Sequence, residues 1–330
     1  MQKVKWGIIG CGAVTEEKSG PAFNLVPNSE LVAVMRRDVA KAADYAKRHK
    51  IAKWYGVAED LINDPDVNAV YVATPPESHA RYAIEALKAK KPVYVEKPMA
   101  LNYKECLEMN KASKAYHTPL FVAYYRRALP GFLKVKELID GGEIGKVRVV
   151  NVKQFKSLST DEINGNLPWR VDPKIAGGGH FFDLASHLLD YFDYLFGPVQ
   201  TVKPIALNQS KYYPAEDVVS SVFLFPNNVV VNGCWCFNVP DFYRGDSIEI
   251  IGEKGVIKFA CFDFIPIELI TKAGTQKFDY PKPAHVQQNM VEQVVNAILG
   301  NGKAHSTGET AARTSKVLDE AVAEYYKEQN

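Results

Sequence analysis

The nine residues GIIGCGAVT, at positions 7–15, decide the fold that we expect for the first part of the chain. They follow a strand-like run and lead into a helical run, which is the context that a dinucleotide-binding turn requires. Gly10 permits a tight turn, and a side chain at Gly12 would keep a pyrophosphate from the helix N-terminal amides of Ala13 and Val14. Thr15 stands where a third glycine is usual, so the motif departs from the common pattern there.

The residues around this turn predict a parallel sheet covered by helices. Short β-rich runs alternate with helical runs up to about residue 124, and each crossover is long enough for a strand-helix-strand unit. Pro21 falls inside the first helical run, so we expect a kink or a new turn at Gly20-Pro21. Asp38 is predicted to cap a helix over Val39 to His49. The predicted strands are Lys5–Ile9, Glu30–Met35, Ala69–Ala73, Pro92–Val95 and Leu120–Tyr124, with a weaker candidate at Lys53–Tyr55.

After residue 124 the pattern changes to one helix, Leu129 to Asp140, followed by a β meander. Val218–Phe225 and Val229–Phe237 flank a turn sequence and predict an antiparallel hairpin, and the segment from Asp246 to Cys261 repeats the pattern. We therefore expect an α/β chain with two domains. Residues 1–124 form the parallel-sheet domain, and residues 125–330 form an α+β domain with a largely antiparallel sheet of about six strands. Two helical runs, Val286 to Leu299 and Thr310 to Lys327, end the chain.

Composition limits the class of protein. Forty Lys and Arg against 38 Asp and Glu leave a net charge of +2 over 330 residues, too weak to hold nucleic acid or an anionic membrane. No apolar stretch approaches the roughly 18 residues of a membrane span, and the N-terminus lacks the pattern of a signal peptide, so we expect a cytoplasmic protein. Five scattered cysteines predict neither a disulfide framework nor a metal site, and Cys234 and Cys236 are interpreted as packing residues on one face of a strand.

The end of the second strand, Met35-Arg36-Arg37-Asp38, bears on the choice of cofactor. A dinucleotide site usually holds the ribose with an Asp or Glu about 20 residues beyond the glycines. Arg36 and Arg37 would instead form charge-assisted hydrogen bonds to a 2′-phosphate, which favours NADP over NAD. The alternative is that both arginines are solvated and Asp38 turns from the helix cap to the ribose.

Three further motifs carry a resemblance to a known family: Ala73-Thr74-Pro75-Pro76 with His79, Glu96-Lys97-Pro98, and the segment GGGHFFDLASH at residues 177–187. Together with the glycine turn, they make the chain similar to the glucose-fructose oxidoreductase, inositol dehydrogenase and MocA family over its whole length. The resemblance implies an N-terminal Rossmann domain, a C-terminal sheet domain that commonly forms the dimer interface, and NAD(P)-dependent redox chemistry on sugars, polyols or their relatives. It also implies cofactor contacts from Thr74, Pro75, His79, Glu96 and Lys97, from the pair Trp169-Arg170, and a possible cis peptide bond at Lys97-Pro98.

The chemistry of the residues agrees with this resemblance. Hydride transfer between a nicotinamide and a carbinol carbon needs a proton exchanger and a positive group near the developing alkoxide. Lys97, at the carboxyl end of a strand, is predicted to polarise the substrate oxygen, and His187 to exchange its proton. Asp183 shares a helix face with His187 and is predicted to bind a neighbouring hydroxyl or to tune the other two. The structural alternatives are a solvated lysine, a carboxylate favoured by the helix dipole and a core histidine.

We therefore expect a dehydrogenase or reductase of a sugar-like molecule that prefers NADP. Apolar residues in both registers of the strands from Val218 to Val231 predict a homodimer or homotetramer built through the second domain. Two other functions stay open: a non-catalytic NAD(P)-binding regulatory protein, which the presence of Lys97, Asp183 and His187 disfavours, and an NAD-dependent glycosidase of the same fold. The segment Tyr124 to Arg127 is interpreted either as a substrate contact or as a surface hinge.

Overall fold

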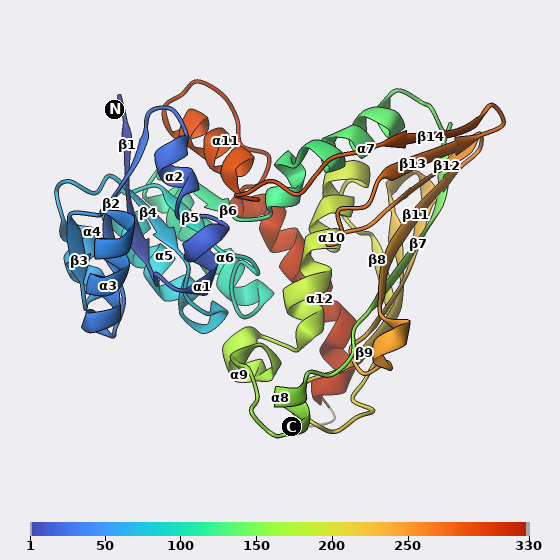
Figure 1. Ribbon diagram of the computed structural model, residues 1–330, viewed down its shortest axis with the longest axis horizontal. Helices are drawn as coiled ribbons and strands as arrows, with labels where there is room; N and C mark the ends of the chain where they lie inside the picture. The colour runs from blue at the N-terminus through green and yellow to red at the C-terminus, as the bar shows by residue number, and fades with distance from the viewer. Residues whose placement is uncertain (1, 328–330) are drawn as a thin grey trace. The chain divides into compact units, whose positions relative to one another are not determined.

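The computed structural model describes residues 2–327, so the last three residues of the predicted second domain lie outside the described part. The chain divides into two compact units (Figure 1). The first unit holds the described residues up to Ala128 together with Pro283–Ala312, and the second holds Leu129–Lys282 together with the described residues from Arg313 onward. Residues 283–312, which the sequence division assigned to the second domain, thus pack with the first unit.

The first unit is built on a six-stranded parallel sheet with the strand order β3-β2-β1-β4-β5-β6. The order reverses between β1 and β4, and in folds of this kind ligands bind outside the carboxyl ends of the strands at that point. All the strands predicted for this domain are confirmed, including the weak candidate. They are β1 (Val4–Ile9), β2 (Ser29–Met35), β3 (Lys53–Tyr55), β4 (Ala69–Val72), β5 (Val93–Val95) and β6 (Leu120–Val122).

Helices cover both faces of this sheet, as its unbroken apolar strands require. One face packs on α4 (Ala58–Asn63), α5 (His79–Lys88) and α6 (Tyr103–Ala115). The other packs on α2 (Ala22–Leu25), α3 (Val39–His49) and α11 (Gln288–Ile298). Helix α11 buries Met290, Val291, Val294 and Val295 in this second layer, which explains why residues 283–312 belong to the first unit.

Two local predictions about this unit are confirmed. The first helical run is interrupted as predicted: α1 (Ala13–Glu17) ends before Gly20, and Pro21 is the N-cap of α2. Asp38 caps α3, since its Oδ1 accepts a hydrogen bond from the Lys41 backbone amide at 3.1 Å.

The second unit is built on an eight-stranded sheet with the order β14-β13-β12-β11-β7-β10-β9-β8. The sheet is mostly antiparallel, as predicted, and only β10 and β7 pair in parallel. Both predicted hairpins are confirmed, but the sheet has eight strands where about six were expected. Its two edge strands, β8 and β14, have no buried residue. The strands are β7 (Val147–Phe155), β8 (Thr201–Leu207), β9 (Val218–Phe225), β10 (Val229–Cys236), β11 (Gly245–Gly252), β12 (Gly255–Phe259), β13 (Ile267–Thr271) and β14 (Gly274–Phe278).

One face of this sheet is covered by α10 (His180–Phe196), whose residues contact β9 and β10. Burial alternates along β9 and β10, so that Val219, Phe223 and Trp235 face the core while Val222 lies exposed on the opposite face. The remaining helices are α7 (Pro130–Asp140), α8 (Thr160–Ile163), α9 (Pro173–Ala176) and α12 (Gly308–Lys327). No helix within residues 2–327 is long and apolar enough to cross a membrane.

Candidate active site

The glycine turn joins β1 to α1 and leaves room for a ligand. Gly10 has a positive φ of 94°, and a Cβ there would lie 2.7 Å from Thr74 Cγ2, so this position requires glycine. A Cβ at Gly12, the N-cap of α1, would meet nothing closer than the Gly10 carbonyl oxygen at 3.8 Å. The space beside Gly12, at the start of α1, is therefore open, and a dinucleotide pyrophosphate binds at such a helix start in folds of this kind.

Thr15, which stands where a third glycine is usual, hydrogen-bonds to the glycine turn. Its hydroxyl donates to the Gly12 carbonyl oxygen at 2.8 Å and accepts from the Gly12 amide at 3.1 Å. The Tyr45 hydroxyl donates to the Thr15 carbonyl oxygen at 2.8 Å, which fixes the buried threonine from the side of α3. The turn thus keeps its shape without the third glycine.

At the end of β2 the two arginines differ in their surroundings. Arg36 is half-buried, and its Nη1 donates to the Cys11 carbonyl oxygen in the glycine turn at 3.2 Å, whereas Arg37 is exposed. Asp38 is engaged by Lys41, whose backbone amide and ammonium both contact the carboxylate. The hydrogen bond from the Lys41 amide is the largest effect that lowers the pKa of Asp38. The structure therefore brings Arg36 to the turn, while Asp38 serves as a helix cap.

In the loop after β5, Lys97 directly follows a buried carboxylate, that of Glu96. Glu96 is only 6% exposed, and its Oε1 accepts from the Tyr71 hydroxyl at 2.5 Å and from Gln287 Nε2 at 2.6 Å. The Tyr94 hydroxyl in turn donates to Gln287 Oε1 at 2.9 Å. Burial raises the pKa of Tyr71 and of Tyr94 well above the ordinary value, so both phenols are neutral donors. Half-buried Lys97 follows, and its peptide bond to Pro98 is cis.

His79 ties this loop to the loop after β4. Its side chain is fully buried, with Nε2 2.7 Å from the Thr74 carbonyl oxygen and Nδ1 3.0 Å from the Pro98 carbonyl oxygen. Burial lowers the pKa of the imidazole. Both ring nitrogens thus face this chain's own backbone, next to half-buried Thr74 and Pro75. A cofactor contact by His79 stays a prediction, and what the structure assigns to its ring is bracing of the two loops.

In the second unit, the glycine run at residues 177–179 starts α10. Gly177 has a positive φ of 86°, and a Cβ at Gly178 would lie 2.2 Å from the Phe182 ring. A Cβ at Gly179 would lie 2.6 Å from the Glu216 carbonyl oxygen. The run therefore allows the helix to begin in close contact with the segment that contains Glu216.

Asp183 and His187 lie on one face of α10, as their spacing predicts. Asp183 forms an ion pair with Arg170, whose Nε lies 3.3 Å from Oδ2, and the Arg170 guanidinium lies 4.4 Å from the centre of the Trp169 ring. His187 is only 3% exposed, and its ring meets the Phe262 ring edge-on with centroids 5.7 Å apart. The structure thus brings Arg170, predicted as a cofactor contact, against the predicted catalytic Asp183.

Three buried side chains near these sites were missed by the sequence analysis. Gln287 reaches Glu96 from 191 residues away, and Glu216 reaches Gly179 from 37 residues away, so neither has a local motif. Glu162 lies 2.7 Å from His180 at the start of α10 and had one signal, the capping box Ser159-x-x-Glu162.

In the segment from Tyr124 to Arg127, both arginines are buried. Arg126 and Arg127 are 3% and 2% exposed, and Arg127 Nη1 donates to the His305 carbonyl oxygen at 3.1 Å. The Arg126 guanidinium lies 5.1 Å from the centre of the Tyr125 ring. The surface interpretation is therefore wrong for both arginines, because they pack within the first unit.

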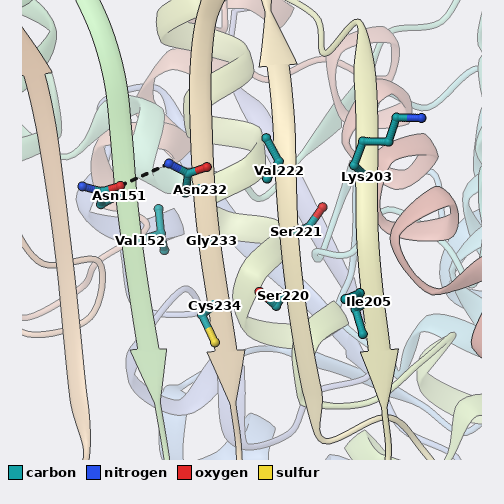
Figure 2. Close-up of a pocket in the computed structure, with 10 residues that line it drawn as sticks. All are labelled: Asn151, Val152, Lys203, Ile205, Ser220, Ser221, Val222, Asn232, Gly233 and Cys234. Atoms are coloured by element: carbon teal, nitrogen blue, oxygen red, sulfur yellow. Dashed lines mark hydrogen bonds between the residues drawn. The ribbon is translucent and has the colours of Figure 1, made fainter.

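A depression of about 410 Å³ lies on the second sheet and contains none of the predicted site residues (Figure 2). Side chains from β7, β8, β9 and β10 line it, and Asn232 Nδ2 donates to Asn151 Oδ1 at 3.4 Å. Cys234 lines this depression. Cys236 lies on the same face of β10 as Cys234, and buried Trp235 lies on the opposite face. Among residues 2–327 no three His, Cys, Asp or Glu side chains are grouped to hold a metal ion.

Comparison with family models matches both parts of the chain. Residues 4–124 match the model described as "Oxidoreductase family, NAD-binding Rossmann fold", and residues 132–258 match the "GFO/IDH/MocA C-terminal domain". Together these matches cover more than half of the chain.

Individual relatives agree with the family models. The chain is 40% identical over 322 residues to Oxidoreductase P35 of Formosa agariphila, covering 96% of this chain and 98% of the relative. It is 28% identical over 280 residues to trans-1,2-dihydrobenzene-1,2-diol dehydrogenase of Sus scrofa, covering 84% and 80%. Levoglucosan dehydrogenase, solved with NADH and levoglucosan, shares the fold with a TM-score of 0.88 at 22% identity, covering 99% and 98%.

Proposed function

The chain belongs to the GFO/IDH/MocA family of NAD(P)-binding oxidoreductases, and we propose that it is an NADP-preferring dehydrogenase or reductase of a sugar, polyol or related carbonyl compound. The observation that carries the proposal is the position of Lys97 after the carboxyl end of β5. It directly follows Glu96, a buried carboxylate that accepts hydrogen bonds from Tyr71 and Gln287. The names of relatives, a diol dehydrogenase and levoglucosan dehydrogenase, support a substrate with CH–OH groups.

Residues of the first unit would hold the cofactor. The open space at Gly12 fits the pyrophosphate, which the amides of Ala13 and Val14 would bind. Arg36 uses Nη1 on Cys11 and has further guanidinium N–H groups for a 2′-phosphate. When bound, the nicotinamide supplies or accepts the hydride.

Three side chains of this chain would handle the substrate. The Lys97 ammonium orients and polarises the substrate oxygen, where negative charge develops. His187 exchanges the proton of that oxygen, since an imidazole exchanges protons near neutral pH without large tuning. Asp183, held in place by Arg170, accepts a hydrogen bond from a neighbouring hydroxyl.

The test is a panel of sugars, polyols and small aldehydes, assayed by nicotinamide absorbance with NADPH, NADP, NADH and NAD. We expect turnover that Lys97→Ala lowers by about 10²-fold or more, because it removes the charge at the developing alkoxide. Cofactor affinity should stay within roughly tenfold, since Lys97 is proposed to act mainly on the substrate oxygen. Lys88→Ala, at an exposed lysine of α5, is the matched control and should leave both unchanged.

The other functions predict different results. A regulatory protein would bind NADP(H) and turn over nothing in the panel. A glycosidase would release sugar from a glycoside with no net change in nicotinamide absorbance. A Lys97→Ala variant with turnover near that of the wild type would contradict the role of Lys97.

A further inference from the structure

Glu216 is a buried carboxylate that the proposed reaction does not use. It lies in the segment between β8 and β9 and has no exposed surface. Its Oε1 accepts a hydrogen bond from the Gly179 amide at 2.8 Å, and its Oε2 accepts one from the Tyr326 hydroxyl at 2.6 Å. One oxygen therefore binds the start of α10 and the other binds the end of α12.

The segment around Glu216 is itself fixed. Asp217 Oδ1 accepts from the Gln209 amide at 2.7 Å, and Oδ2 accepts from the Ser210 amide at 2.8 Å. The Tyr325 hydroxyl of α12 donates to the Pro214 carbonyl oxygen at 2.9 Å. Because Pro214 and Asp217, on either side of Glu216 in the chain, are both hydrogen-bonded, the segment gives the Glu216 carboxylate a fixed position against which α10 can be located.

The contact with α10 is made directly to the backbone. Gly179 is the N-cap of the helix, and a Cβ there would lie 2.6 Å from the Glu216 carbonyl oxygen and 3.2 Å from Oε1. Asp183 and His187 follow four and eight residues later, which is about 6 and 12 Å along a helix axis. A shift of the first turn would therefore displace Asp183 most directly, together with the His187 ring on the same face.

A second carboxylate holds the same turn through a side chain. Glu162 Oε1 lies 2.7 Å from His180 Nε2, and Glu162 Oε2 accepts from the Ser159 amide and hydroxyl. Although burial raises the pKa of Glu162, the bonds from His180 and Ser159 lower it to about 2. For Glu216, burial outweighs the bonds from Tyr326 and Gly179 and raises the pKa to about 7.

The pKa shifts of Glu162 and Glu216 thus have opposite directions. The bonds from His180 and Ser159 favour the ionised form of Glu162, whereas burial favours the protonated form of Glu216. A protonated Glu216 can donate to the Tyr326 oxygen and still accept from Gly179 through its other oxygen. A glutamine has the same donor and acceptor pattern, so it should keep both contacts.

We propose that Glu216 is a positioning residue that, through the Gly179 amide, holds the first turn of α10 where Asp183 and His187 can act on substrate. The proposal rests on the roles given to these two residues under the proposed function. Nothing in it concerns the cofactor, which the first unit would bind.

The experiment compares Glu216→Ala, which removes both contacts, with Glu216→Gln, which keeps them. We expect Glu216→Ala to lower kcat by roughly 10- to 100-fold, the range in which a misplacement of catalytic groups acts. Affinity for NADPH, measured by fluorescence titration, should change by less than about twofold, since no cofactor contact is lost. Glu216→Gln should retain kcat within about threefold, because a neutral amide preserves the geometry.

Asp193→Ala is the control for a loss of stability alone. Asp193 is buried on the last turns of α10 and forms a two-pronged ion pair with Arg313 at 2.7 Å, about 15 Å along the helix from Asp183. The Asp193→Ala variant should therefore be less stable than the wild type, with an unchanged kcat in the folded enzyme. Should Glu216→Ala fail to fold, Gly179→Ala replaces it, because the added Cβ pushes the same turn away from Glu216.

A second readout does not depend on turnover. Hydrogen exchange of the amides at residues 179–183 should be faster in Glu216→Ala than in the wild type and in Glu216→Gln. If the wild type turns over no substrate in the panel, the proposed function fails, and this comparison alone decides whether Glu216 anchors the turn. Wild-type kcat in folded Glu216→Ala, equal loss in Glu216→Gln, or unchanged exchange at these amides would each overturn the proposal.

Discussion

Removal of the Arg36 guanidinium should abolish a preference for NADPH. Arg36 reaches the glycine turn through a hydrogen bond to the Cys11 carbonyl oxygen, and this bond uses only Nη1. Hydrogen bonds to a charged partner contribute about 1.5 to 3 kcal/mol, which corresponds to roughly 10- to 150-fold in affinity. We therefore expect NADPH to bind at least about tenfold more tightly than NADH, and Arg36→Ala to remove most of this difference with little effect on NADH.

Fluorescence titrations of both nucleotides, side by side at two salt concentrations, measure this preference. The ratio should shrink with added salt, because a partly exposed phosphate contact is screened. Arg37→Ala removes the same charge from an exposed neighbour and is the matched control, with a smaller expected change in the ratio. Equal affinities in the wild type, or tighter binding of NADH, would refute the reasoning.

A separate variant tests the alternative that Asp38 binds the ribose of the cofactor. Asp38 would have to give up its bond from the Lys41 amide in order to reach a ribose, and that bond starts α3. Asp38→Asn keeps a good N-cap but removes the carboxylate. NADH affinity should therefore stay unchanged in this variant, and a tenfold loss would show that Asp38 receives the ribose.

The remaining predictions concern the second unit. His187→Asn should lower turnover by about 10²-fold or more, because it removes the proposed proton exchanger; turnover near that of the wild type would mean that another group exchanges the proton. Light scattering should give a multiple of the chain mass, because Ile205 and Val222 lie 65% and 43% exposed on the open sheet face; the mass of one chain at micromolar concentration would contradict this. Burial raises the pKa of Glu216 from 4.5 to about 7, so the folded state binds this proton more tightly than the unfolded state does. Its stabilising effect is complete below about pH 4.5 and falls by about 3 kcal/mol as the pH rises past 7. Urea denaturation should show this decline in the wild type relative to Glu216→Gln, and parallel stability curves would count against it.

The parts of the fold that local patterns determine were predictable from the sequence. The apolar runs of β1 to β6, the cap at Asp38 and the break at Gly20-Pro21 all depend on residues within a few positions of one another. The assignment of residues 283–312 to the first unit was not predictable, because α11 is amphipathic and its sequence does not say which apolar surface it covers. The edge strand β14 was missed for the opposite reason, since its exposed residues show no alternation.

The candidate site divides in the same way. Lys97, Asp183 and His187 were predicted because they stand in local motifs, but the groups that bond to Glu96 and to the N-cap of α10 come from distant segments. Gln287 donates to Glu96, and Glu216 accepts from Gly179, across 191 and 37 residues. Spacing patterns report neighbours along one strand or one helix, so they carry no information about such contacts.

Both elements that carry the predicted catalytic side chains thus begin at a buried carboxylate: Glu96 before Lys97, and Glu216 against the first turn of α10. Burying a carboxylate costs several kcal/mol, and apolar residues of similar volume often stabilise a fold at least as well. Apolar packing is not directional, however, whereas a carboxylate that receives N–H and O–H groups from two segments fixes their relative position. Groups that must act on one substrate oxygen need to be held to about 0.5 Å. We therefore expect Glu96 and Glu216 to matter more for the positions of Lys97 and of the first turn of α10 than for the stability of the fold.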